Sequence, residues 1–135
     1  MFAWLRTNRY RRTAGFTLIE LVVVLAILGI VISLAVPRYL AARKKAYKVE
    51  ADNVLQEIKT LEWSYFQEQG AFDTSPNGAA LGFVPPGRMH WNAPVISGSN
   101  PITITMTGAA PPLTNQDRVW ITLASDGSSS GGSNF

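Results

Sequence analysis

Residues 16–36 read FTLIELVVVLAILGIVISLAV and hold a single charged side chain, Glu20. As an α-helix this stretch would be about 31 Å long, close to the thickness of roughly 30 Å of the hydrocarbon layer of a bilayer. An apolar run of this length is typical of a transmembrane helix. We therefore predict that residues 16–37 lie in a membrane and that any soluble core is built by the residues after them.

The sequence before the apolar stretch is basic. Residues 1–15, MFAWLRTNRYRRTAG, contain four arginines and no acidic residue. The whole chain has 12 Lys and Arg against 9 Asp and Glu, a net charge of +3; without these four arginines it has 8 against 9, a net charge of −1. Basic residues that flank a membrane helix tend to stay in the cytoplasm, so we expect a cytoplasmic N-terminus.

Helical periodicity continues after the apolar stretch. Pro37 is compatible with a continuing helix because membrane helices tolerate proline. Apolar residues beyond it recur at intervals of 4, 3, 4, 3 and 4, which predicts one buried helical face made of Tyr47, Ala51, Val54, Ile58, Leu61 and Tyr65. Charged side chains are expected largely elsewhere on the helix: Lys45, Lys48, Asp52, Lys59 and Glu62. Gly70 is a natural stop, so residues 38–69 are predicted to form the amphipathic half of one long helix.

Residues 70–135 are predicted to form a small β-rich head. Residues 70–88 are rich in Gly and Pro and indicate a loop with one short turn of helix. Three strand candidates follow: about Met89–Ile96, Ile102–Thr107 and Val119–Ala124. Their alternation predicts an antiparallel sheet of about three strands packed on the helix, which is an α+β fold. The end of the chain, SDGSSSGGSNF, is predicted to be a flexible tail with a turn at Asp126-Gly127.

The junction between the basic segment and the apolar helix carries the motif Gly15-Phe16-Thr17-Leu18-Ile19-Glu20. In this position the motif resembles the prepilin peptidase signature of type IV pilins and of the related pseudopilins of type II secretion. The order of basic leader, long helix, connecting loop and small antiparallel sheet resembles the pilin fold over the whole chain. The resemblance implies a structural subunit that polymerises into an extracellular filament for adhesion, motility or DNA uptake.

The resemblance also implies roles for single residues. Residues 1–15 would be a leader that prepilin peptidase removes between Gly15 and Phe16, after which Phe16 would be N-methylated. Glu20 would face the N-terminal amine of Phe16 in a neighbouring subunit. Gly29 and Pro37 match the positions between which the helix of assembled pili is often unwound. The implied partners are other copies or sibling pilins, the prepilin peptidase and an assembly platform in the inner membrane, with the precursor in that membrane and the filament on the cell surface.

Residue chemistry supports two of these roles. Gly15 has no side chain, so a protease can approach its carbonyl closely and the backbone is free to extend. A carboxylate such as that of Glu20 is costly in hydrocarbon and needs a partner. No Lys, Arg or His lies within one helical turn of Glu20, so we expect its charge partner to come from another molecule.

Two alternative functions are consistent with parts of the sequence. A major pseudopilin of type II secretion would have a similar head, but that family uses an acidic C-terminal calcium loop and the comparable stretch here is poor in acids. A secreted binding domain would need a conventional signal peptide, and Ser33-Leu34-Ala35 offers a cleavage site for one. The sequence of the mature N-terminus separates these classes, because Phe16 supports a pilin and Val36 a secreted domain.

Signals for catalysis or metal binding are few. The chain has no cysteine, and His90 is its only histidine. A disulfide and a thiolate metal site are therefore excluded, and zinc would lack ligands. A Ser–His–Asp triad would require His90 to meet Asp117 or Asp126 from separate parts of the chain. We predict no enzymatic activity, no cofactor and no metal site.

Nucleic-acid binding is a weaker alternative. Two groups combine a cation with an aromatic ring: Arg88, His90 and Trp91, and Arg118 with Trp120. The predicted head carries two Arg against three Asp, a net charge of −1, which disfavours contact with phosphates. We expect Trp91 and Trp120 to be core aromatics of the sheet instead.

Overall fold

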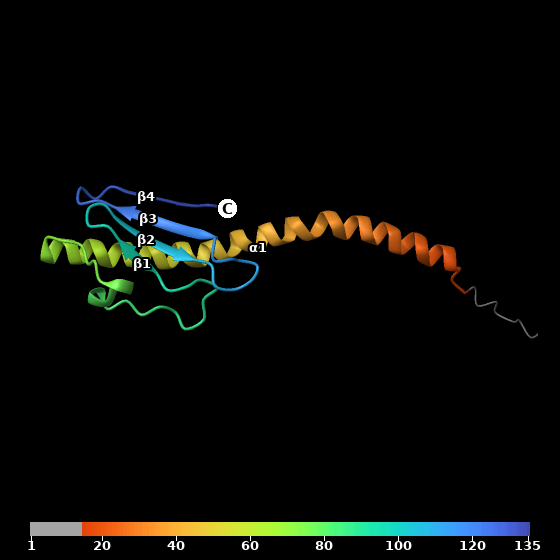
Figure 1. Cartoon of the computed structure of the whole chain (residues 1–135), viewed down its shortest axis with the longest axis horizontal. Coiled ribbons are helices and arrows are strands. Elements are labelled where there is room, and N and C mark those ends of the chain that lie inside the picture. The colour runs from red at the N-terminus through yellow and green to blue at the C-terminus, as the bar shows by residue number, and fades with distance from the viewer. Residues whose placement is uncertain (1–14) are drawn as a thin grey trace, which may run out of the picture. The chain divides into compact units, whose positions relative to one another are not determined.

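The computed structural model describes residues 15–135 (Figure 1). Its elements are the helix α1 (Leu18–Gln69), the short 3-10 helix η1 (Pro76–Leu81) and the strands β1 (Val95–Ser97), β2 (Ile102–Thr107), β3 (Arg118–Leu123) and β4 (Ser129–Ser133). The chain divides after Pro37 into two compact units. The predicted basic leader, apart from Gly15, lies outside the described residues, and so does the predicted cytoplasmic N-terminus.

The first unit is the apolar part of α1. Its large side chains are exposed, from 46% for Val24 to 86% for Phe16. The stretch is long and apolar enough to cross a membrane, and no residue in its most apolar part is buried within the chain. This agrees with the predicted membrane segment, because such side chains need lipid or other protein around them.

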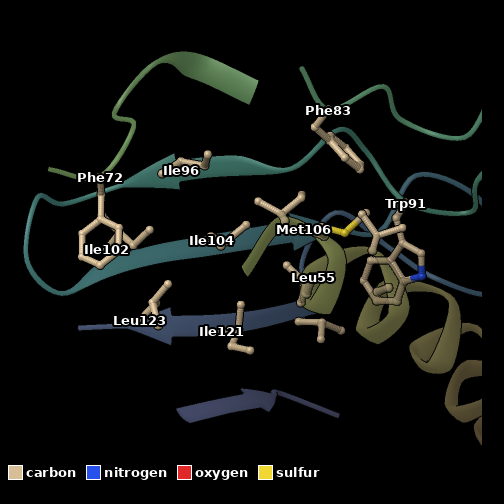
Figure 2. Close-up of a cluster of buried hydrophobic side chains, with 14 of the residues drawn as sticks. Leu55, Phe72, Phe83, Trp91, Ile96, Ile102, Ile104, Met106, Ile121 and Leu123 are labelled. Atoms are coloured by element: carbon tan, nitrogen blue, oxygen red, sulfur yellow. The ribbon is translucent and has the colours of Figure 1, made fainter. Parts of the chain in front are cut away.

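The second unit is an antiparallel sheet packed on the remainder of α1. The strand order is β1-β2-β3-β4, and every neighbouring pair is antiparallel. Alternate residues of the two central strands face inward, as Figure 2 shows for Ile102, Ile104 and Ile121. Together with the buried face of α1 they form one core: Ala51, Val54, Leu55, Ile58, Ile102, Ile104, Met106, Val119, Ile121 and Leu123. The α+β fold predicted from the sequence is confirmed.

The first strand is much shorter than predicted. The prediction of Met89–Ile96 was wrong, because β1 covers only Val95–Ser97 and Trp91 makes an isolated bridge to Gly108. Pro94 stands between them, and a proline has no N–H to donate to a strand ladder. The predicted strands at Ile102–Thr107 and near Val119–Ala124 are confirmed as β2 and β3.

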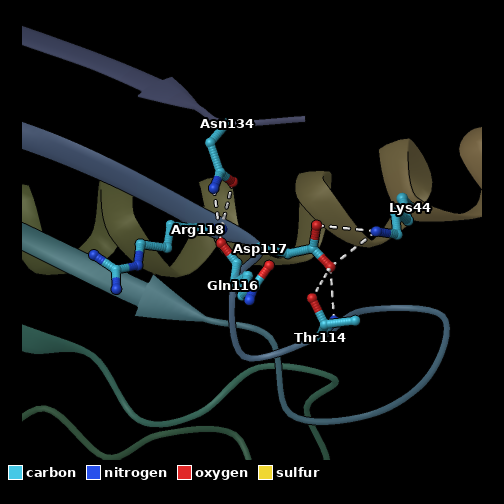
Figure 3. A network of polar contacts seen from close by, with 6 residues as sticks. All are labelled: Lys44, Thr114, Gln116, Asp117, Arg118 and Asn134. Atoms are coloured by element: carbon cyan, nitrogen blue, oxygen red, sulfur yellow. Dashed lines mark hydrogen bonds and ion pairs between the residues drawn. The ribbon is translucent and has the colours of Figure 1, made fainter.

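The end of the chain is a fourth strand, so the prediction of a flexible tail was wrong. Residues 129–133, SSGGS, pair along their whole length with β3. Asn134 extends this contact: its Oδ1 accepts the N–H of Arg118 at 2.7 Å and its Nδ2 donates to the carbonyl of Gln116 at 2.7 Å (Figure 3). The predicted turn at Asp126-Gly127 is confirmed, with Gly127 at φ +82° and its N–H bonded to the carbonyl of Ala124.

The buried face of α1 agrees in part with its predicted pattern. Ala51, Val54 and Ile58 are buried as expected, whereas Leu55 was missed. The placement of Glu62 away from the core was wrong, because this side chain is fully buried. Tyr47 and Leu61 pack at the core margin, and Tyr65 is half-buried. The helix ends at Gln69, and Gly70 follows with φ +73°, as a glycine stop should.

An ionic network ties the loop between β2 and β3 to α1 (Figure 3). The Nζ atom of Lys44 donates to both carboxylate oxygens of Asp117 at 2.9 Å. The same carboxylate accepts the backbone N–H and the hydroxyl of Thr114. Burial by itself would raise the pKa of Asp117, but the hydrogen bonds from Lys44 and Thr114 and the charge of Lys44 hold that pKa below its ordinary value.

Candidate processing and assembly site

The helix begins with a capping box inside the GFTLIE motif. Thr17 stands just before the first helical residue, and Glu20 is the third residue of α1. Oε2 of Glu20 accepts the backbone N–H of Thr17 at 3.0 Å and its hydroxyl at 2.8 Å. In return, the backbone N–H of Glu20 donates to Oγ1 of Thr17 at 3.3 Å. Reciprocal bonds of this kind satisfy amide groups that have no partner at a helix N-terminus.

The capping box adds Thr17 to the residues singled out from the sequence. The sequence argument considered only charged partners for Glu20 and overlooked the T-x-x-E spacing, which is itself a signal of a helix start. Among residues 15–135, only one oxygen of Glu20 is engaged, and no cation neutralises it. The carboxylate is thus held by polar contacts with Thr17, and the part of the chain that the structure describes gives it no cationic partner.

The segment before the helix is accessible. Residues 15–17 have no regular secondary structure and are exposed, with Phe16 86% exposed. A side chain added at Gly15 would meet nothing within 4 Å. Gly15 and Phe16 are thus uncovered, as a protease substrate must be, and cleavage between them stays a prediction.

The two positions linked with helix flexibility lie inside α1. Both Gly29 and Pro37 fall within its continuous helical assignment. A side chain added at Gly29 would also meet nothing within 4 Å. Unwinding between these residues in a filament stays a prediction.

Trp91 and His90, two of the residues considered for nucleic-acid binding, are engaged in contacts within the head. Trp91 is buried, and its Nε1 donates to the carbonyl of Tyr47 at 2.8 Å, so it is a core residue as predicted. The same expectation was wrong for Trp120, which is half-buried and alternates with the inward-facing residues of β3. His90 stacks on Tyr47 with ring centroids 3.8 Å apart, and its Nδ1 lies 3.0 Å from Oε2 of Glu50. The aromatic ring of Trp91 is thus unavailable for stacking on a base.

The acids considered for a triad are engaged elsewhere. Asp117 binds Lys44, and Asp126 accepts the N–H of Ser128 at 2.8 Å, while His90 contacts Glu50. Within residues 15–135, no three His, Asp or Glu side chains are close enough to share a metal ion.

Comparison with known proteins agrees with the motif. Residues 10–36 match the family described as "Prokaryotic N-terminal methylation motif". The fimbrial protein EcpC of Eikenella corrodens is 33% identical over 119 residues, which are 84% of this chain and 77% of that protein. The type IV major pilin protein PilA of Myxococcus xanthus is 34% identical over 82 residues. The type II secretion system core protein G of Dickeya chrysanthemi is 34% identical over 68 residues.

These matches differ in extent. The match to the Myxococcus pilin covers 60% of this chain but only 36% of that protein, and the match to protein G covers 50% of this chain and 44% of that protein. No solved structure matches the chain significantly. The match to the Eikenella fimbrial protein, in contrast, extends over most of both sequences. With its methylation motif, its apolar N-terminal helix and its antiparallel head, the chain belongs to the type IV pilin and pseudopilin family.

Proposed function

We propose that this chain is a precursor that is cut between Gly15 and Phe16 and then polymerised into an extracellular filament. The observation that carries the proposal is the GFTLIE motif at the start of an apolar helix whose side chains are uncovered. The exposed stretch needs lipid before assembly and other subunits after it. The membrane meets the first requirement, and a filament core formed by these helices meets the second.

Glu20 is the residue that couples cleavage to assembly. Hydrolysis after Gly15 creates a cationic amine on Phe16, and N-methylation of that amine leaves it cationic. The capping box holds Glu20 at the N-terminus of α1, where its second oxygen can accept a further donor. Pairing with the amine of a neighbouring subunit removes two uncompensated charges from an apolar environment, so it favours the filament over the monomer.

Thr17 is a positioning residue in this scheme. Its N–H and hydroxyl hold one carboxylate oxygen of Glu20 and fix the direction of the other. They also lower the cost of keeping the ionised side chain near lipid before a second subunit arrives, because hydrogen bonds to a charged acceptor are stronger than those between neutral groups.

The partners follow from the same scheme. They are further copies or sibling pilins, the prepilin peptidase that cuts the leader, and an assembly platform in the inner membrane. The precursor resides in the inner membrane, and the filament reaches the cell surface. Similarity to protein G of type II secretion favours one alternative, a pseudopilin whose short filament serves secretion. Surface fibres labelled by an antibody to the head support the pilus, and fibres confined to the envelope support the pseudopilus.

The cleavage step is tested with a matched pair of glycine variants in cells that hold the peptidase. Gly15→Val should leave the leader attached, because the bulky side chain blocks the approach to the carbonyl. Gly29→Val is the control, since this glycine is equally free of neighbours but lies inside α1. Mass spectrometry should find mature protein beginning at methylated Phe16 for the wild type and for Gly29→Val. Normal maturation of Gly15→Val would refute the proposed site.

A further inference from the structure

Glu62 is an acid at a position where the fold offers it no cation. It lies near the C-terminal end of α1 and is fully buried. Its Oε2 accepts the backbone N–H of Asp73 at 3.0 Å. Among the described residues, its Oε1 is the one buried side-chain nitrogen or oxygen atom without a hydrogen bond. An ionised carboxylate in such a place is costly, and a protonated one costs much less because it carries no charge.

The bond from Asp73 makes Glu62 the anchor of the segment that follows the helix. Asp73 is itself 6% exposed, and its carboxylate accepts the N–H of Ser75 at 2.8 Å, the hydroxyl of Ser75 at 2.6 Å and the N–H of Ala80 at 3.2 Å. Glu62 therefore holds the first part of residues 73–80, and Asp73 holds the rest. The path of this segment therefore depends on two buried carboxyl groups, the first of which holds the residue that carries the second.

The groups around Glu62 offer no compensating charge. From the following loop, the charged group that acts on it is Asp73, which is also acidic. On α1 the titratable residues one turn away are Lys59 and Tyr65, and neither forms a hydrogen bond or ion pair with Glu62. The inward side chains of β2 and β3 are apolar. Burial raises the pKa of Glu62 to about 7; the N–H of Asp73 lowers it in part, and the charge of Asp73 raises it.

We propose that Glu62 is a pH-sensitive latch: its protonated carboxyl keeps residues 70–82 closed against the end of α1, and its ionisation releases them. The closed segment binds the proton more tightly than the open one, in which the carboxyl is hydrated and has its ordinary pKa of 4.5. Closure is therefore most favourable below pH 4.5, weakens as the pH rises towards 7, and stays weak above it. The latch acts within the head and does not depend on polymerisation.

Hydrogen exchange on the full chain in detergent tests the latch. Protection factors of the amides of residues 73–80, corrected for intrinsic exchange rates, are compared at pH 5 and pH 8. The wild type should lose protection by roughly 70-fold, the factor expected between pH 5 and pH 8 from a pKa of 4.5 in the open form and about 7 in the closed form. Core amides of β2 and β3 should remain the slowest to exchange at both pH values. Equal exchange of the segment and the core at pH 8 would overturn the proposal of a local release.

Two variants separate the latch from general effects of pH. Glu62→Gln keeps an acceptor for the N–H of Asp73 but cannot ionise, so its protection should not change between pH 5 and pH 8. Glu57→Gln removes an exposed acid from the same helix and should behave as the wild type does. A similar loss of protection in Glu62→Gln and in the wild type would overturn the proposal. If Glu62→Gln does not fold, the carboxyl ¹³C shift of Glu62 in the wild type decides: a midpoint near 7 supports the latch, and one near 4.5 refutes it.

Discussion

The ion pair between Lys44 and Asp117 should contribute far more to the stability of the head than the more exposed ion pair between Lys48 and Asp52 does. Both Lys44–Asp117 and Lys48–Asp52 join α1 lysines to aspartates at short distances, 2.9 and 2.7 Å. The side chain of Asp117 is 10% exposed and that of Asp52 is 41% exposed. The two pairs therefore compare a buried ion pair between distant parts of the chain with a more exposed pair within one helix.

The magnitude follows from the bonds that Asp117→Asn removes. The amide oxygen of Asn can still accept the two bonds from Thr114, but its NH₂ group would face the ammonium of Lys44. Loss of the charge-assisted bonds from Lys44 should cost about 2 kcal/mol, within the range for hydrogen bonds to charged groups. For a head of this size that corresponds to a fall in Tm of roughly 8–16 °C. Asp52→Asn should cost about 0.5 kcal/mol or less, as exposed pairs at i,i+4 do.

Urea unfolding of the full chain in detergent, followed by tryptophan fluorescence, measures both variants. The effect of Asp117→Asn should be complete near neutral pH and disappear in acid. The pKa of Asp117 is held below its ordinary 3.8, so its stabilising contribution is present above that value and lost as the pH falls through the lower one. A double-mutant cycle with Lys44→Met isolates the coupling between the two side chains. Equal effects of Asp117→Asn and Asp52→Asn at pH 7 would show that the argument from burial is wrong.

Further predictions concern assembly and a crowded glycine. Glu20→Ala should leave the precursor inserted and cleaved but reduce its entry into filaments, and wild-type amounts in sheared fibres would contradict the proposed charge pairing. Thr17→Val should impair assembly in the same way and Thr17→Ser should restore it, because only serine keeps a hydroxyl for the capping box; equal fibre yields for the two would exclude a positioning role. Gly108→Ala should destabilise the head by about 1–3 kcal/mol in urea unfolding, because the carbonyl of Thr114 occupies the place of the added methyl group. Gly87→Ala, with open space around it, should be neutral, and parity between these two variants would disprove the crowding.

Patterns that lie close together in the sequence were sufficient to predict much of this protein. The length and composition of the apolar run before Pro37 are enough to predict a helix that can cross a membrane. The alternation of ITITMT in β2 predicts which residues face the core, because side chains of a strand point to opposite faces in turn. The helical spacing after Pro37 places Ala51, Val54 and Ile58 on the buried face for a similar reason. The GFTLIE motif could be read directly, and its T-x-x-E spacing also contained the capping box of Thr17.

Other features depend on contacts between residues far apart in the sequence. The SSGGS segment has little intrinsic preference for a strand, and β4 forms because the edge of β3 offers it unpaired backbone groups. Glu62 belongs to a charged series on α1 by its sequence, yet its position opposite Asp73 places it in the interior. The sequence alone does not decide whether Trp120 faces the core. In the structure, Val119 and Ile121 occupy the inner face of β3, so Trp120 lies on the other face. Local patterns thus determined the helix, the central strands and the processing motif, whereas only tertiary packing decided the last strand and the buried acid, because their energies come from partners that the local sequence does not contain.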